Sequence, residues 1–235
     1  MKKSIIFFIL CFATIQAKEA EYRDTVYLAT YPRSGNTWTR LLIEEATHIK
    51  TESVYPNETL PEQSLYAKDI IRAASLCQEA SDIVVMKTHY PCFNIPLNPR
   101  SFRKAIHIIR NPIDSFYSFA VLENKGSRIG FVPNKVLVRM IKEWKQFQTF
   151  WLSQNNVFTI RYEDILQNPG ECLAKILDEI GYQVDEEDIL RAINMFPPLE
   201  NELKHLKHFS KSDIQFIKNQ LGPIMKKFHY EIPDS

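Results

Sequence analysis

The sequence predicts an α/β fold in which helices cover both faces of a central parallel sheet. Short runs with strand character recur along the chain, at 25–30, 83–86, 105–109 and 157–160. Segments with helical spacing separate these runs, and such an alternation is typical of a parallel sheet. The run at 83–86 is apolar throughout, as expected for a strand buried on both faces. A length of 235 residues, 45% of them hydrophobic, suits one such domain.

The helices and loops between the strands follow from spacing and composition. Helical spacing predicts helices at about 37–50, 65–79, 115–122, 134–153, 170–180, 186–194 and 210–228. Pro112 and Asp114 favour a helix start, because proline suits a first turn and a carboxylate complements the helix dipole. Proline, asparagine and glycine residues predict loops at 51–63 and 124–131. Gly222-Pro223 can interrupt the last helix.

The N-terminus has the pattern of a secretory signal peptide. Lys2 and Lys3 precede a short apolar run at 5–15, and Ala17 suits the last residue before cleavage. The run is short for a membrane-spanning helix. We therefore expect a signal peptide at 1–17 and a single exported domain at 18–235 without a transmembrane helix. The alternatives are an uncleaved anchor or a start codon placed upstream of the true one, which would leave the protein in the cytoplasm.

The charge balance and the cysteines exclude several classes of function. Lys and Arg number 29 against 28 Asp and Glu, so no overall basic field favours nucleic acid or an anionic membrane. Any anion site must therefore depend on local placement of charge. The cysteines show no C-x-x-C pair or Cys/His ligand spacing, so no metal site is predicted. They are Cys11, Cys77, Cys92 and Cys172.

Polar and basic residues follow the predicted strands at their carboxyl ends. These groups are Arg33-Ser34, Lys87-Thr88-His89, Arg110-Asn111 and Arg161-Tyr162. Ligands of open parallel sheets bind outside these strand ends, and the helix start after the first loop offers unpaired N–H groups to an anion. The sequence therefore predicts a polyanion site. Each residue also has a simpler interpretation, such as a surface lysine, a loop histidine or an ion pair between Arg110 and Asp114.

The first loop differs from that of metal-dependent nucleotide enzymes. It lacks the G-x-x-x-x-G-K-[ST] sequence of a P-loop, because its one glycine, Gly35, is followed by Asn36-Thr37. The second and third strands end in basic residues, whereas magnesium needs a carboxylate there. These differences oppose a small-molecule kinase and favour an anionic ligand bound without metal.

Four segments together resemble the PAPS-dependent sulfotransferases, which use 3′-phosphoadenylyl sulfate (PAPS) as sulfuryl donor. The segment YPRSGNTW at 31–38 is similar to their 5′-phosphosulfate loop, and KTHYP at 87–91 to their K-T-H-x-P segment. RNPIDSFYS at 110–118 matches their 3′-phosphate motif, and YED at 162–164 matches a fourth. The resemblance covers about 25–169 in family order. It implies a P-loop-like fold with three layers and sulfuryl transfer to an acceptor hydroxyl or amine.

The resemblance also implies roles for individual residues. His89 would be the general base, with Lys87 and Arg33 supporting the transferring group by their charge. Arg110 and Ser118 would bind the 3′-phosphate, and Trp38 and Tyr162 would contact adenine. The 5′-phosphate and sulfate would be held by the loop residues Arg33, Ser34, Gly35, Asn36 and Thr37.

The sequence departs from the family at two points. Arg33 stands where many members have lysine, and arginine stays protonated. If that lysine acts as an acid in other members, Arg33 must act by charge alone or Lys87 must take its place. The C-terminal R-K-G-x-x-G loop is missing; Lys204, His205, Lys207 and His208 could replace it, although a solvated basic helix end is the simpler interpretation. A catalytically inert nucleotide-binding protein therefore remains an alternative. Neither the acceptor nor the oligomeric state is predicted.

Overall fold

The computed structural model describes residues 25–55, 83–93, 102–198 and 205–233. The predicted signal peptide at 1–17 and the predicted helix at 65–79 lie outside the described residues. Both stay predictions, as does the division of the chain into a signal peptide and one domain at 18–235. None of the helices in the described ranges combines the length and apolar character that crossing a bilayer requires.

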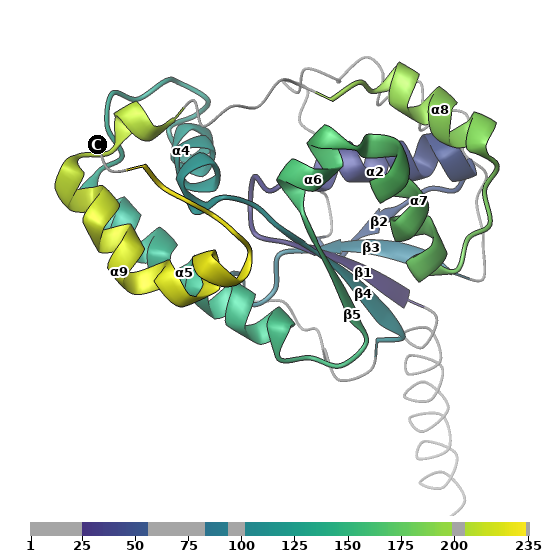
Figure 1. The fold of residues 1–235 in the computed structure, drawn as a ribbon, viewed down its shortest axis with the longest axis horizontal. Coiled ribbons are helices and arrows are strands. Elements are labelled where there is room, and N and C mark those ends of the chain that lie inside the picture. The colour runs from purple at the N-terminus through teal and green to yellow at the C-terminus, as the bar shows by residue number, and fades with distance from the viewer. Residues whose placement is uncertain (1–24, 56–82, 94–101, 199–204, 234–235) are drawn as a thin grey trace, which may run out of the picture.

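Five parallel strands form the central sheet, in the order β2-β3-β1-β4-β5 (Figure 1). They are β1 (Thr25–Thr30), β2 (Glu52–Ser53), β3 (Val84–Thr88), β4 (Lys104–Ile109) and β5 (Val157–Arg161). The central strand β1 is buried along its whole length, since β3 and β4 flank it and helices cover both faces. All four predicted strands are present, and the predicted α/β fold with a parallel sheet is confirmed.

Helices cover the two faces of the sheet in separate layers (Figure 1). One layer contains α2 (Asn36–Thr47), α6 (Tyr162–Gln167), α7 (Pro169–Ile180) and α8 (Glu186–Met195). The other contains α4 (Pro112–Glu123), α5 (Asn134–Leu152), α9 (Lys211–Lys227) and the short 3-10 turn η2 (Leu206–His208). The result is the three-layer arrangement that the sequence predicts.

Alternation along β1 builds a separate core on each face. Val26 and Leu28 pack with α2, α7 and α8, whereas Tyr27 and Ala29 pack with α4, α5 and α9. Successive side chains of a strand point to opposite faces, so one strand supplies both cores. The sheet is therefore anchored from both sides, which holds its carboxyl ends in fixed positions.

Two short elements and one helix differ from the sequence prediction. The strand β2 has two residues and α6 has six, too few for a hydrophobic pattern to emerge. The helix α9 continues through Pro223, although a proline normally breaks a helix. Its buried face of Ile217, Leu221 and Met225 spans the proline, and this packing holds the helix together.

Candidate active site

The loop between β1 and α2 has the geometry of an anion site. Arg33 and Gly35 adopt left-handed backbone conformations, with φ of 65° and 92°. Gly35 is the N-cap of α2, which has neither a side-chain cap nor an acidic residue in its first turn. The first N–H groups of a helix have no partner within the helix, and its dipole favours negative charge there. The α2 N-terminus is therefore open to an anion.

Side chains of the loop brace it against the sheet. Asn36 Nδ2 donates to Leu28 O at 3.3 Å and to Thr30 Oγ1 at 3.2 Å. The Ser34 hydroxyl is fully buried, 3.4 Å from Ser115 Oγ. Both residues were predicted to bind the ligand, and the structure directs their side chains into the protein. The Ser34 N–H also stays within the loop, donating to Tyr31 O at 3.1 Å, so the ligand contacts of both residues stay predictions.

Tyr162 covers this loop from the start of α6. A Cβ atom built on Gly35 would lie 2.4 Å from Tyr162 Cδ2, so only glycine leaves room for the ring. Trp38 packs edge-on against Tyr162 at 6.1 Å, and its indole N–H donates to Phe196 O at 2.9 Å. Trp38 is 6% exposed. The predicted contacts of Trp38 and Tyr162 with adenine stay predictions.

Arg33 and Arg110 lie together, although 77 positions separate them. Arg110 Nη1 donates to Arg33 O at 2.6 Å, and Arg33 Nε donates to Ser118 Oγ at 2.9 Å. The Arg110 guanidinium stacks on the Tyr162 ring at 4.6 Å. The first loop and the 110–118 segment therefore meet as the strand-end pattern predicts.

The charges of Arg33 and Arg110 lie close to each other without a direct ion pair to a carboxylate in the described residues. Desolvation and then the Arg110 charge lower the pKa of Arg33, and Arg110 Nε is buried without a hydrogen-bond partner. Within the described part of the chain, neither guanidinium forms an ion pair. The ion pair of Arg110 with Asp114, considered from the sequence, is therefore absent there. Two close positive charges and an orphaned donor leave a place for a bound anion.

Asp114 lies beside this pair at the start of α4. It is 3% exposed, and burial raises the pKa of its carboxyl to about 6, with Arg110 acting in the opposite direction. Asn111 caps the helix by accepting from Ile113 N at 3.0 Å, and its own N–H donates to Glu163 Oε1 at 2.9 Å. The 110–118 and 162–164 motifs are thus joined by a direct hydrogen bond.

His89 follows the end of β3 and is oriented by β1. Its Nδ1 lies 2.6 Å from Thr30 O. A carbonyl can only accept, so Nδ1 carries the proton and the lone pair of the neutral imidazole lies on Nε2. Lys87 precedes it on β3 and is 8% exposed. The arrangement gives His89 the tautomer that a base acting through Nε2 requires.

The basic segment predicted to replace the missing C-terminal loop packs on α4. Lys204 lies outside the described residues. His205 and His208 stack on Tyr117, with ring centroids 4.5 and 3.9 Å away, and Tyr117 precedes Ser118 in the chain. The segment therefore packs on the helix that carries Ser118, and its proposed role stays a prediction.

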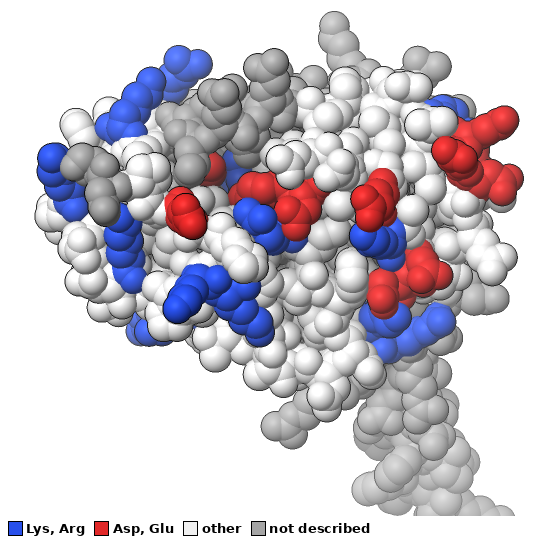
Figure 2. All heavy atoms as spheres, viewed as in Figure 1, with Lys and Arg blue, Asp and Glu red and all other residues white. Residues whose placement is uncertain are grey.

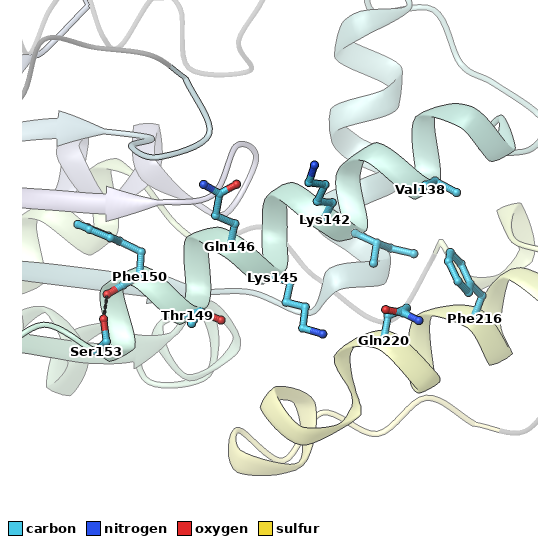
Figure 3. Close-up of a pocket in the computed structure, with 10 residues that line it drawn as sticks. Val138, Lys142, Lys145, Gln146, Thr149, Phe150, Ser153, Phe216 and Gln220 are labelled. Atoms are coloured by element: carbon cyan, nitrogen blue, oxygen red, sulfur yellow. Dashed lines mark hydrogen bonds between the residues drawn. The ribbon is translucent and has the colours of Figure 1, made fainter.

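The groove on the described surface and its charge distribution do not coincide with the candidate site. A groove of about 670 Å³ lies between α5 and α9, lined by residues such as Val138, Lys145 and Phe216 (Figure 3). None of the predicted site residues lines it. Figure 2 shows basic and acidic side chains interspersed over the face in view. In the described ranges no group of three His, Cys, Asp or Glu residues could hold a metal ion.

The fold and the site define an α/β protein in which two arginines and a helix N-terminus gather at the carboxyl ends of the strands. The family described as "Sulfotransferase domain" matches residues 23–220. The chain belongs to the sulfotransferase family, and the family predicted from the sequence is confirmed.

The chain is similar in sequence to curated relatives and in fold to a solved structure. Sulfotransferase 1A1 of Bos taurus is 24% identical over 239 residues, covering 95% of this chain and 81% of that protein. A WSCD family member of Aedes aegypti is 27% identical over 187 residues, covering 72% of this chain; the chain spans 54% of that protein's length. The crystal structure of mouse sulfotransferase SULT7A1 complexed with PAP superimposes with a TM-score of 0.61 at 15% identity, covering 91% of this chain and 92% of that one.

Proposed function

We propose that the chain transfers a sulfuryl group from PAPS to an acceptor hydroxyl or amine. The observation that carries this proposal is the pair of Arg33 and Arg110, which lie together and form no ion pair in the described ranges. PAPS carries a phosphosulfate and a separate 3′-phosphate, so it offers two anionic groups to a site that presents two cations and a helix N-terminus.

The residues of the site fit these two anionic groups. Arg110 and Ser118 would hold the 3′-phosphate, for which the unpartnered Arg110 Nε is a ready donor. The backbone of the 33–37 loop and the α2 N-terminus would hold the phosphosulfate. Arg33 belongs to this loop and also contacts both proposed 3′-phosphate residues, because its carbonyl accepts from Arg110 and its side chain donates to Ser118.

His89, Lys87 and Arg33 would carry out the transfer. When bound, PAPS supplies a sulfuryl group attached to a phosphate that leaves readily. As the sulfur bond to the acceptor oxygen forms and its bond to the bridging oxygen breaks, His89 Nε2 takes the acceptor proton. Lys87 and Arg33 neutralise charge on the transferring group and on the leaving oxygen. Arg33 acts by charge alone, since it stays protonated.

Calorimetry with PAP, the desulfated product, tests the donor site. Arg110→Ala is expected to weaken PAP binding by about 10- to 100-fold, the loss of one or two charged hydrogen bonds. Arg103→Ala is the matched control, because Arg103 precedes β4 at its opposite end and is exposed. It removes the same charge and should leave the PAP affinity within twofold. A wild-type chain that does not bind PAP would contradict the proposed function.

His89→Asn separates an enzyme from an inert nucleotide-binding protein. Asparagine can keep the hydrogen bond to Thr30 O but cannot act as a base. It should keep PAP affinity and lower transfer from radiolabelled PAPS by about 10²- to 10⁴-fold. His48→Asn is the control, since His48 is exposed at the far end of α2. If wild type binds PAP but sulfates no carbohydrate, phenolic or tyrosyl-peptide acceptor, the result favours a catalytically inert nucleotide-binding protein.

We also propose that the chain is exported after cleavage near Ala17, as the basic residues and apolar run at 2–15 support. Mass spectrometry of the protein purified from its native host should then find an N-terminus near Lys18. Detection of intact Met1 would contradict cleavage.

A further inference from the structure

Tyr55 is brought to the candidate catalytic residues by the edge strand β2. Ser53 of β2 pairs in register with Lys87 of β3, and Val54 N donates to Lys87 O at 3.1 Å. Because the strands are parallel, the residue after Val54 lies beyond their common carboxyl end. Tyr55 therefore stands at the edge of the sheet where the donor site lies.

The side chain of Tyr55 contacts both candidate catalytic residues. Its hydroxyl accepts a hydrogen bond from His89 N at 2.9 Å, and its ring lies 5.7 Å from the His89 ring at an interplanar angle of 30°. Lys87 Nζ lies over the same ring, 5.8 Å from its centroid. One aromatic side chain thus contacts the proposed base and the proposed stabilising cation.

His89 is consequently restrained from two directions. Thr30 O fixes the Nδ1 edge of the imidazole, and Tyr55 fixes its backbone and one ring face. Phe93 adds an edge contact to both rings, with centroids 6.0 Å from His89 and 6.2 Å from Tyr55. These contacts leave the direction of Nε2 determined by the protein before any acceptor binds, which is the condition for efficient proton transfer.

We propose that Tyr55 is a positioning residue for sulfuryl transfer, holding the His89 imidazole and the Lys87 ammonium in their working arrangement. The proposal rests on the proposed function. The hydroxyl of Tyr55 sets the position of His89 through its backbone N–H. The face of its ring attracts the Lys87 ammonium by a cation–π contact and so limits where that charge can move. Tyr55 itself exchanges no proton with the acceptor.

Two variants separate the hydroxyl from the ring. Tyr55→Phe keeps the ring and leaves the His89 N–H without this acceptor, and we expect kcat to fall about 10-fold. Tyr55→Leu also removes the ring beneath Lys87, and we expect a fall of about 100-fold, as a misplaced catalytic group produces. In both variants the PAP affinity should stay within twofold of wild type, because Tyr55 contacts neither Arg33 nor Arg110.

Tyr182→Phe is the matched control. The Tyr182 hydroxyl donates to Ile83 O at 2.7 Å, at the opposite end of β3. Its loss removes one tyrosine hydrogen bond next to the same strand, at the end away from His89, so kcat should stay within twofold. Equal losses of kcat in Tyr55→Phe and Tyr182→Phe would overturn the proposal, as would a Tyr55→Phe variant with wild-type kcat.

Nitrogen NMR of His89 tests the inference independently of activity. In wild type the ring should show the tautomer protonated at Nδ1. In both variants the ring should stay protonated at Nδ1, since Thr30 O remains, but its signals should shift, and more in Tyr55→Leu than in Tyr55→Phe because Tyr55→Leu also removes the ring contact. Signals that superimpose on those of wild type in both variants would overturn the proposal. Failure of PAP binding would instead contradict the proposed function, and the NMR comparison would still decide the role of Tyr55.

Discussion

Gly35 tolerates no side chain, because both its backbone conformation and its contact with Tyr162 require glycine. Its φ of 92° disfavours any L side chain, and an added Cβ would lie 2.4 Å from the Tyr162 ring. We expect Gly35→Ala to destabilise the protein by about 2–4 kcal/mol, the sum of left-handed strain and overpacking. Urea denaturation measures this loss, and PAP calorimetry should show weaker binding because the loop or the ring must shift.

Gly130→Ala is the control for that prediction. An added Cβ at Gly130 has nothing within 4 Å, so its effect on stability should stay within about 0.5 kcal/mol. Equal stability of Gly35→Ala and wild type would show that Tyr162 moves aside without cost. The sequence predicted a turn at Gly35, but the approach of Tyr162, distant in the chain, could be seen only in the fold.

The helix α9 tests whether tertiary packing can hold a helix together against the helix-breaking tendency of a proline. Pro223 is exposed within this helix, where it lacks an N–H and its ring crowds the carbonyl one turn earlier. We expect Pro223→Ala to stabilise the protein by about 1–3 kcal/mol, less than the full helix penalty because proline also restricts the unfolded chain. Denaturant unfolding followed by circular dichroism measures the change.

Gln220→Ala controls for the gain in helix propensity alone. Gln220 is exposed one turn before Pro223, and its replacement should change stability by no more than about 0.5 kcal/mol. If Pro223→Ala is no more stable than Gln220→Ala, the helix accommodates its proline without a penalty. The interpretation that packing offsets a destabilising Pro223 would then be wrong.

The elements that the sequence predicted are those with an apolar run of four or more residues or with sustained helical spacing. The strands at 25–30 and 105–109 and the helix at 134–153 differ from the structure by at most one residue at an end. The strand β2 was missed because a two-residue edge strand forms through hydrogen bonds to β3, not through an apolar pattern. With β2 missed, Tyr55 was also missed.

At the scale of the whole molecule, the sheet order assembles the site. Because β1 lies between β3 and β4, the first loop has His89 on one side and Arg110 on the other. The rule for strand ends was sufficient to predict that these residues converge. It could not predict the hydrogen bond between Arg110 and the Arg33 carbonyl or the inward direction of the Asn36 side chain, since both depend on three-dimensional packing.

The same packing makes the stability of the molecule depend on two opposing titrations. His107 is fully buried on β4, its Nε2 is 2.7 Å from Gln148 Oε1, and burial lowers its pKa to about 4 from a usual value of 6.5. Between these values the unfolded chain binds the extra proton, so stability falls as the pH falls. Asp114 has a pKa raised to about 6 from 3.8. Between these two values the folded chain binds the extra proton at Asp114, so stability falls as the pH rises.

The contributions of His107 and Asp114 to the pH dependence of stability oppose each other between about pH 4 and 6. We therefore expect the free energy of unfolding of the wild-type chain to change little in that window without PAP. Asp114→Asn removes the Asp114 contribution and leaves that of His107. The stability of this variant should fall by on the order of 3 kcal/mol from pH 6.5 to 4. His107→Gln, which keeps a hydrogen-bonding group near Gln148, should instead gain stability on acidification by a similar amount. Urea unfolding at several pH values measures all three curves. Parallel curves for the two variants would contradict the opposing roles of His107 and Asp114.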